Sequence, residues 1–200
     1  MFTEDTELAR RGDDEIAEKS YDHETITAAD CYGMDFQSVI FTGCRFIDCD
    51  FAKASFYGCR FLRCDLSNCK LPDSYWKECD IEGCKLYGAD LTNSVFKQTI
   101  FSENNLSYAL ISESRFEGCK FSECDLSNAL MSQDTFKNTV FRDCRFIRTE
   151  LFKTSLKGID LSECELSGIT LSESLYELRG AQVSYVQAAE LARLLGVKIK

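Results

Sequence analysis

Cysteine is the residue type with the widest chemical repertoire in this sequence, which has 12 cysteines but only one histidine, His23. Cysteine side chains bind zinc, form disulfides or act as nucleophiles. No Cys-x-x-Cys pair occurs, and 11 of the 12 cysteines are separated from one another by multiples of five residues. This spacing does not match metal-ligand motifs. We therefore expect no metal and no cofactor, and we expect the cysteines to be small, reduced, buried residues.

The other residues that could carry catalysis do not form a recognisable set. A Ser-His-Asp or Cys-His arrangement would need His23, which lies outside the regular part of the sequence. No glycine-rich phosphate loop is present, and the carboxylates are spread along the chain. We expect a protein that is not an enzyme. Asn104 and Asp134 are polar where their counterparts are small. Each marks either a kink at a partner contact or a side chain bonded to neighbouring backbone.

The feature that positions all of these residues is a period of five. From Phe36 to Tyr176, every fifth residue is large and apolar, which makes 29 consecutive pentads. Such a period fits neither a helix nor a flat strand, so the chain must turn in every pentad to keep one side inward. A second inward position lies two residues before each large one and holds small residues, including most of the cysteines. A fixed short period is typical of a repeat architecture.

Residues 20 apart resemble each other more than neighbouring pentads do. Phe36, Phe56, Trp76, Phe96 and Phe116 form an aromatic column, while the column that contains Leu71 and Leu91 is aliphatic. One coil is therefore four pentads, and the fold class is an all-β solenoid with a roughly square cross-section. With coils spaced by about 4.8 Å, the rod is about 35 Å long. We expect an acidic segment or cap over residues 1–25, the solenoid over residues 26–183, and a different C-terminal module over residues 184–200.

The C-terminal module changes to a helical period. Ser184 and Gln187 form a capping-box pattern, Gly196 is suited to the helix end, and Val197 and Ile199 indicate a short strand. We expect a helix from about Ser184 to Leu195, which buries a stripe of Ala188, Leu191, Ala192 and Leu195. Its remaining apolar residues would contact a second copy of the chain; the alternative is a helix that caps a monomer. The expected dimer interface comprises Tyr185, Val186, Ala188, Leu191, Ala192, Leu194 and Leu195.

Charge is the remaining functional signal. The chain has a net charge of −10, which argues against direct nucleic-acid binding and favours basic partners. No apolar run is long enough to span a membrane, no secretory signal is present, and reduced cysteines fit the cytoplasm. Acidic residues gather on two opposite sides of the expected rod, where they are either partner-binding faces or a solubilising surface. The candidates are Asp80, Glu82, Glu103, Glu123, Asp143, Asp160 and Glu163 on one side, and Asp90, Glu113, Glu150 and Glu173 on the other.

The repeated motif Cys-Asp-Leu-Ser-Asn at 64–68 and 124–128 resembles the pentapeptide-repeat proteins. That resemblance implies a right-handed quadrilateral parallel β-helix. Residues 187–199 resemble the tail of the Qnr and MfpA branch of the family, although the repeat lacks the loops of Qnr proteins. The branch resemblance implies a homodimer through the C-terminal helix that mimics DNA, binds DNA gyrase or topoisomerase IV and affects quinolone susceptibility. The alternative is an interaction scaffold with no topoisomerase role.

Overall fold

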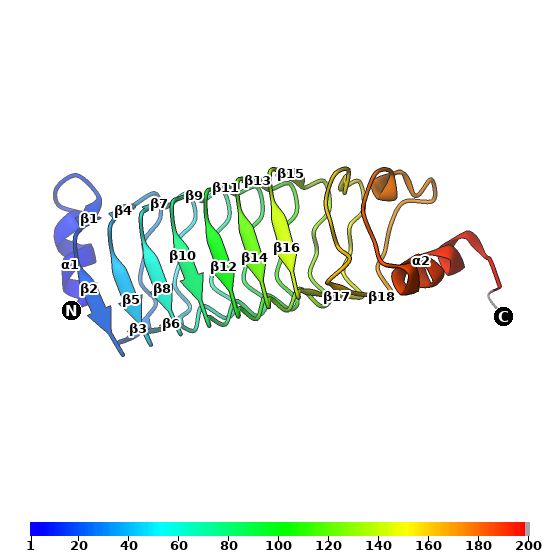
Figure 1. Ribbon diagram of the computed structural model, residues 1–200. Helices are drawn as coiled ribbons and strands as arrows, with labels where there is room; N and C mark the ends of the chain where they lie inside the picture. Colours follow the sequence, from blue (N-terminus) through cyan, green and yellow to red (C-terminus); the bar gives the residue numbers. More distant parts are fainter. Residues whose placement is uncertain (199–200) are drawn as a thin grey trace.

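The protein is a rod of stacked coils with a short helix at each end (Figure 1). The structure, a computed structural model, describes residues 1–198. Neighbouring strands are parallel, and their partners are 20 residues apart: Phe36 pairs with Phe56, and Phe56 with Trp76. This register confirms that one coil consists of four pentads. The predicted fold class, a right-handed quadrilateral parallel β-helix with a short C-terminal helix, is confirmed.

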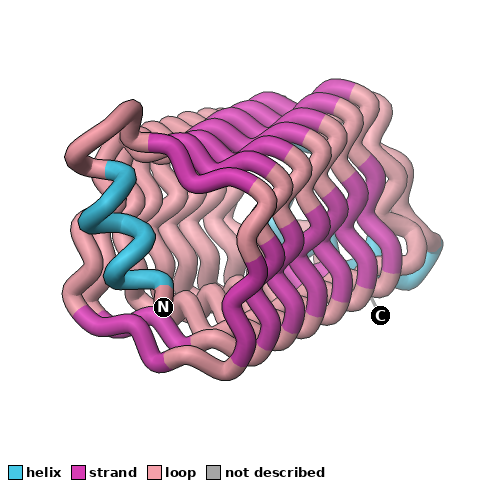
Figure 2. The backbone as a smooth tube through the Cα atoms, turned by 90° about the vertical axis from the view of Figure 1, so that its left-hand side faces the viewer, coloured by secondary structure: helices cyan, strands magenta, loops and turns pink. Residues whose placement is uncertain are grey.

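The coils are four-sided, as Figure 2 shows along the rod axis. The first face contains the Phe36 column and the second face the Phe41 column; the third and fourth faces contain the Phe46 and Phe51 columns. The first face is a seven-stranded sheet of β1 (Glu15–Ala17), β4 (Asp35–Gln37), β7 (Ser55–Tyr57), β9 (Tyr75–Lys77), β11 (Val95–Lys97), β13 (Arg115–Glu117) and β15 (Thr135–Lys137). The second face is a seven-stranded sheet of β2 (Ser20–Asp22), β5 (Ile40–Thr42), β8 (Arg60–Leu62), β10 (Asp80–Glu82), β12 (Ile100–Ser102), β14 (Lys120–Ser122) and β16 (Val140–Arg142).

The other two faces are less regular. The third face contains two short sheets, β3 (Thr25–Thr27) with β6 (Arg45–Ile47) and β17 (Arg145–Ile147) with β18 (Glu165–Ser167), joined by single bridges. The fourth face is held by single bridges alone, from Asp30↔Asp50 to Glu150↔Thr170.

The chain turns at each corner through a residue in the left-handed region. The residue two positions after each large inward residue has a positive φ in almost every coil, for example Gly43 at 60° and Glu103 at 56°. Glycine adopts this conformation without strain, whereas other residues do so at some cost. At Gly43 an added Cβ would also lie 2.7 Å from the exposed His23 ring, so a side chain there would require that ring to move. The corners explain how a period of five keeps the same side inward.

Stacked aromatic rings fill the interior. In the first column, the ring centroids of Phe36 and Phe56 lie 5.0 Å apart, and those of Phe96 and Phe116 lie 4.8 Å apart. The column from Phe36 to Phe116 is buried. Such stacks combine a large buried apolar area with favourable ring geometry, so they supply most of the stability of the rod.

The small inward residues do more than fill space. The Sγ atom of Cys44 donates to the Tyr21 carbonyl of the coil before, and the hydroxyls of Ser94 and Thr149 donate to Leu71 and Leu126 in the same way. All 12 cysteines are buried and free. Burial raises the pKa of the Cys69 thiol to about 12 and that of Cys119 to about 11. The Sγ atoms of nine cysteines donate to carbonyls of the coil before, so these cysteines tie one coil to the next.

The N-terminus is a folded cap rather than a tail, and the solenoid begins earlier than the expected boundary at residue 26. Helix α1 (Phe2–Ala9) lies across the open end of the first coil (Figure 2), and β1 already pairs with β4. The Phe2 side chain is fully buried, with its ring 5.0 Å from that of Tyr21 and 5.6 Å from that of Phe41. The first rung would otherwise expose its rings and backbone to water, which explains the order of this segment.

The C-terminal module begins one pentad before the pattern suggests. The last large position, Tyr176, lies in the 3₁₀ turn η1 (Tyr176–Leu178) and is 36% exposed, whereas Glu177 is buried. The Glu177 carboxylate accepts hydrogen bonds from the backbone amides of Lys153 and Ser172. In a regular solenoid, these amides would donate hydrogen bonds to a further coil. Because the Glu177 carboxylate accepts them instead, the pentad repeat ends at Leu171.

The expected C-terminal helix is present. Helix α2 (Tyr185–Ala192) continues into the 3₁₀ turn η2 (Arg193–Leu195), and the capping box between Ser184 and Gln187 is formed. Gly196 ends this segment with a φ of 75°. Val197 and Lys198 form no strand, and the remainder of the strand expected at Val197 and Ile199 lies outside the described residues.

Candidate functional site

The second face carries an ordered row of carboxylates. Glu103, Glu123, Asp143 and Glu163 occupy the same position in four successive coils, and all four are exposed. The first three are corner residues with positive φ, which point their side chains away from the core. None of the four forms an ion pair with a described residue. Glu103, Glu123 and Asp143 follow the coil spacing of about 4.8 Å, whereas Glu163 lies on a cleft beyond the last strand of the sheet. We call these four residues the acidic row.

The other predicted acids of this face are more scattered. Asp80 lies beside Arg60, with 3.7 Å between Oδ2 and Nε, whereas Glu82 is exposed. Asp160 is exposed and accepts a hydrogen bond from the Ser162 amide, and the Ser162 contacts lower its pKa. Arg142 is also exposed on this face, next to Asp143 in the sequence.

The fourth face is acidic but interrupted. The Asp90 carboxylate accepts hydrogen bonds from Thr92, and that of Glu150 accepts one from the Ser132 hydroxyl at 2.7 Å. Leu110 and Leu130 occupy the two coils between them. Glu113 and Glu173 are exposed at the next corner. The predicted acids therefore do lie on two opposite faces, but only the second face carries acids at one position in four successive coils.

Sequence reasoning missed a basic row on the first face. Lys77, Lys97, Lys137 and Lys157 occupy equivalent positions in successive coils, with Glu117 in the remaining coil. Lys137 and Glu117 form an ion pair at 2.5 Å. The charges of this face sum to zero because acids spread along its whole length offset the bases; the acids are Asp35, Glu78, Glu117, Asp134 and Glu177. Sorting the charges by position within each pentad, instead of summing them, would have revealed the row.

Helix α2 presents an exposed apolar surface at the end of the rod. Its inner side is anchored by Gln187, whose Nε2 donates to the carbonyls of Leu161 and Cys164, and by half-buried Leu191. Ala192 is also half-buried. The exposed candidates of the predicted interface are Tyr185 at 91%, Val186 at 77%, Leu194 at 43% and Leu195 at 70%, together with Ala188.

The expected buried stripe is therefore wrong for Ala188 and Leu195. Gln187 and Leu191 are one helical turn apart, so they share a face, and Ala188 is rotated about 100° away from Gln187. Leu195 lies in the 3₁₀ turn η2, which changes its direction.

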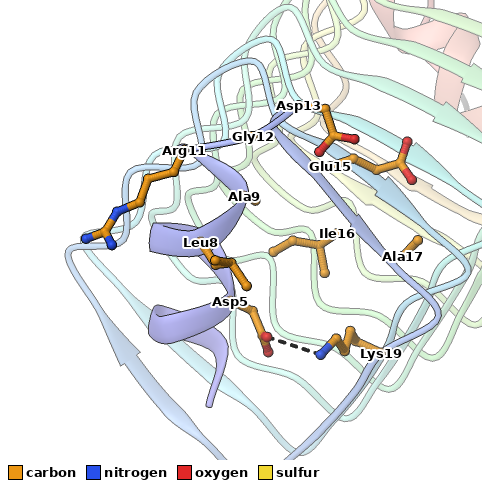
Figure 3. A pocket seen from close by; sticks show the side chains of 10 residues that line it. All are labelled: Asp5, Leu8, Ala9, Arg11, Gly12, Asp13, Glu15, Ile16, Ala17 and Lys19. Carbon is orange, nitrogen blue, oxygen red and sulfur yellow. Dashed lines mark hydrogen bonds and ion pairs between the residues drawn. The ribbon is translucent and has the colours of Figure 1, made fainter.

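A cleft of about 410 Å³ opens beside helix α1, at the opposite end of the rod (Figure 3). Leu8 and Ile16 lie on its apolar part, and Lys19 forms an ion pair with Asp5 at 3.2 Å. The ion pair joins the helix to the first coil. The residues around this cleft form no pairing of a nucleophile with a base, so it is a boundary between the cap and the rod.

The structure also places the residues considered for metal binding and catalysis. Within residues 1–198, no three His, Cys, Asp or Glu side chains are grouped to hold a metal ion. The exposed His23 ring contacts its neighbour Asp22, with 2.9 Å between Nδ1 and Oδ1. No helix in the described part of the chain has the length and hydropathy of a membrane span.

The Asn104 side chain forms hydrogen bonds with neighbouring backbone, which confirms the second of the two interpretations given for this residue. Its Oδ1 accepts from the Cys84 amide and its Nδ2 donates to the Ile81 carbonyl, both at 2.8 Å. Asp134 makes only half of this pattern: Oδ1 accepts from the Ser114 amide at 2.8 Å, and Oδ2 has no partner. Burial raises the Asp134 pKa to about 8.

The regular stack is interrupted once, immediately after β15 and β16. Both large sheets end there (Figure 1), and no backbone hydrogen bond joins residues 135–143 to residues 155–163. The third and fourth faces remain closed through β17, β18 and the Glu150↔Thr170 bridge. Two clefts, of about 480 and 280 Å³, open on the first and second faces. We call this two-sided gap the seam.

The large and small inward positions, the left-handed corners and the four-pentad coils define a class of parallel β-solenoid built from pentapeptides. The sequence matches two family descriptions, "Pentapeptide repeat region" over residues 34–109 and "Pentapeptide repeats (9 copies)" over residues 116–154. Together these matches cover more than half of the chain, which belongs to the pentapeptide-repeat proteins. No curated protein matched the sequence.

Several solved structures resemble the rod. A trypsin-treated variant of QnrB1, a plasmid-mediated fluoroquinolone resistance protein, is 23% identical, with 93% of this chain and 97% of that chain covered and a TM-score of 0.46. Rfr23 from the cyanobacterium Cyanothece 51142 is 11% identical, with coverages of 90% and 99% and a TM-score of 0.32. HetL from Nostoc sp. strain PCC 7120, involved in heterocyst differentiation regulation, is 14% identical, with coverages of 84% and 88% and a TM-score of 0.25. These likenesses assign no function.

Proposed function

We propose that this protein mimics DNA and binds DNA gyrase or topoisomerase IV, thereby altering susceptibility to quinolones or other gyrase poisons. The observation that carries the proposal is the acidic row: four exposed, unpaired carboxylates in register along one face. A line of negative charge steers a basic groove toward it as a phosphate backbone does. The description of QnrB1 as a fluoroquinolone resistance protein adds a precedent within the same family. The free thiols fit a cytoplasmic location, which belongs to the same proposal.

The proposed assembly is a homodimer through helix α2. This helix lies at the end of the rod opposite α1 (Figure 1), and Tyr185, Val186 and Leu195 are largely exposed. A two-fold contact uses the same patch on both chains and would join two rods end to end. The acidic rows of two chains would then serve one long ligand surface.

An interaction scaffold without a topoisomerase role is the second candidate. The lysine row on the first face favours it, because a rod with both signs of charge binds partners other than DNA-binding grooves. The two candidates predict different effects on gyrase. DNA mimicry predicts that the protein alters gyrase activity through the acidic row, whereas a scaffold without a topoisomerase role leaves that activity unchanged.

A gyrase supercoiling assay separates the two candidates. We expect the wild-type protein at micromolar concentration to inhibit supercoiling or to protect gyrase from a quinolone. The triple variant Glu123→Lys/Asp143→Lys/Glu163→Lys should lose this effect while its circular dichroism spectrum is unchanged. The matched control is Asp73→Lys/Glu113→Lys/Glu173→Lys, which changes the net charge equally on the fourth face and should retain most of the effect. Absence of any wild-type effect on gyrase and topoisomerase IV would contradict DNA mimicry.

The dimer is tested by light scattering after gel filtration. We expect twice the sequence mass of 22.7 kDa at tens of micromolar protein. Leu194→Glu places a charge on the exposed apolar patch and should give the monomer mass with an intact β spectrum. The control Ser174→Glu lies on an exposed turn outside the patch and should remain dimeric. A wild-type mass near 22.7 kDa would refute the dimer.

A further inference from the structure

At the seam, backbone groups of β15 and β16 lack the hydrogen bonds to the next coil that the other strands of the two large sheets make. In the coils below it, the Gln98 and Gly118 amides donate to the Glu117 and Lys137 carbonyls at 2.8 Å. The equivalent amide, that of Asn138, has no such partner in the described structure. The coil above is paired on its far side, where the Leu156 amide donates to the Glu177 carbonyl at 2.9 Å, but it has no backbone bond to β15. The β15 edge therefore presents alternating donors and acceptors in the manner of an edge strand.

An apolar side chain lies at this edge. Phe136 is only partly buried, although the aromatic residues before it in the same column are fully buried. In the next coil its counterpart is the aliphatic Leu156, which pairs with the C-terminal module. Phe136 contributes to the cleft of about 480 Å³ on the first face. An extended ligand at this edge would cover the ring and the unpaired backbone together.

The exposed charges around this cleft are positive, although the chain as a whole has a negative net charge. Lys153 and Lys157 both lie on its wall and are exposed, and neither forms an ion pair with a described residue. The Lys153 ammonium lies 5.1 Å from the centre of the Phe152 ring. The one carboxyl group on the wall belongs to Asp134, which is 5% exposed and whose pKa burial raises to about 8. At neutral pH the cleft thus presents two cations and no exposed anion.

We propose that the seam is a docking site for an acidic, extended peptide segment of a partner protein, which adds as a strand to the β15 edge. Strand addition supplies main-chain hydrogen bonds for affinity, and alternate side chains supply specificity. One side of the segment would place an apolar residue on Phe136, and its acidic residues would reach Lys153 and Lys157. The first-face cleft at this edge contains no residue of the acidic row, whereas Glu163 lines the second-face cleft of the seam. The proposal does not depend on gyrase binding.

A peptide fits these features better than a nucleic acid does. The unpaired groups of the β15 edge alternate along the backbone at the spacing of a strand, which only another polypeptide backbone matches. A phosphate backbone would satisfy the lysines but would leave the carbonyl oxygens of the edge unpaired. The two lysines also select against basic and neutral segments, which distinguishes this edge from a general aggregation surface.

The test is fluorescence anisotropy with the full-length protein and a labelled peptide of sequence Asp-Thr-Glu-Phe-Glu-Thr-Asp. We expect saturable binding, weakened at least tenfold in Lys153→Glu/Lys157→Glu. The matched control Lys77→Glu/Lys97→Glu alters lysines of the same face where the sheet is closed, and should change the affinity less than twofold. On binding, amide hydrogen exchange should slow within residues 134–143.

Three further ligands make the test decisive. A peptide with Lys in place of each acid should not bind. Of the two acidic peptides with alternate amides N-methylated, the one whose methylated amides face the β15 edge should not bind. A single-stranded oligothymidylate should bind at least tenfold more weakly than the acidic peptide. The proposal is overturned by absence of acidic-peptide binding at millimolar concentration, or by equal losses in both double-lysine variants. Undiminished binding of both N-methylated peptides, or oligothymidylate binding as tight as that of the acidic peptide, also overturns it.

Discussion

Replacing Asp134 with asparagine should stabilise the protein, and the gain should grow with pH. Asp134 is 5% exposed and its Oδ2 has no hydrogen-bond partner. Asn104, at a corresponding inward position, uses its Nδ2 to donate to the carbonyl 23 residues earlier. Ser94 and Ser114, in the same column as Asp134, donate to carbonyls at that separation. In Asp134→Asn, the amide supplies a donor that the ionised carboxylate lacks.

The magnitude follows from the shifted pKa. Burial raises the Asp134 pKa from its ordinary value of 3.8 to about 8. Between these values the folded protein holds a proton that the unfolded chain has released, so stability falls as pH rises from about 4 and levels off above about 8. At pH 7 the difference is about three pKa units, and at about 1.4 kcal/mol per unit the penalty reaches about 4 kcal/mol. Asp134→Asn removes this penalty, since asparagine does not ionise.

Urea unfolding of both proteins at pH 4.5, 7 and 9 measures the effect. The gain in unfolding free energy in Asp134→Asn should be under about 1.5 kcal/mol at pH 4.5 and largest at pH 9. Asp143→Asn is the matched control, because Asp143 is exposed on the surface and should show no comparable gain. A gain that does not change between pH 4.5 and 9, or a net loss of stability at pH 7, would refute the reasoning.

Three further predictions concern the packing of the rod. Phe2→Ala should lower the unfolding free energy by about 3–5 kcal/mol, since Phe2 is fully buried, whereas Leu8→Ala, on the exposed side of the same helix, should cost under about 0.5 kcal/mol; equal losses would contradict the capping role. Phe96→Ala and Phe116→Ala should each cost about 3–5 kcal/mol in denaturant unfolding, and losses below about 1 kcal/mol at both positions would disagree with stacked aromatic columns. The 12 cysteines should react slowly with Ellman's reagent until the protein unfolds, and no zinc should copurify; rapid reaction of several thiols in the native protein would show that they are accessible.

The repeating part of the fold was predictable because each pentad carries its own signal. The inward side, the coil length and the stacking of Phe56 on Phe36 all follow from residues 20 apart resembling each other. The capping box at Ser184 is likewise local. The cap at the N-terminus was not predictable in this way, because α1 is only eight residues long and is ordered by one long-range contact set around Phe2.

The candidate surfaces were less predictable than the core. The acidic row followed from the period, because position within the pentad decides exposure. The seam left no break in that period: Leu156 and Leu161 stay in frame and buried. Their coil pairs with the C-terminal module on its far side but has no backbone bond to β15 or β16 below, and no residue pattern marks this difference. The only local signs were the change from aromatic to aliphatic large inward residues after Phe146 and the unusual Asp134.

Helix α1 also bears on whether the protein can grow into fibres. Every coil presents the same backbone edge as the one before it, which is the geometry that lets cross-β assemblies lengthen by adding identical units. At the N-terminal end this templating is blocked, because α1 lies over the first rung (Figure 2). The buried Phe2 ring packs against the rings of Tyr21, Phe36, Phe41 and Phe46. Any head-to-tail polymerisation must therefore first displace that helix. A helix of eight residues thereby prevents another rod from adding to the first coil.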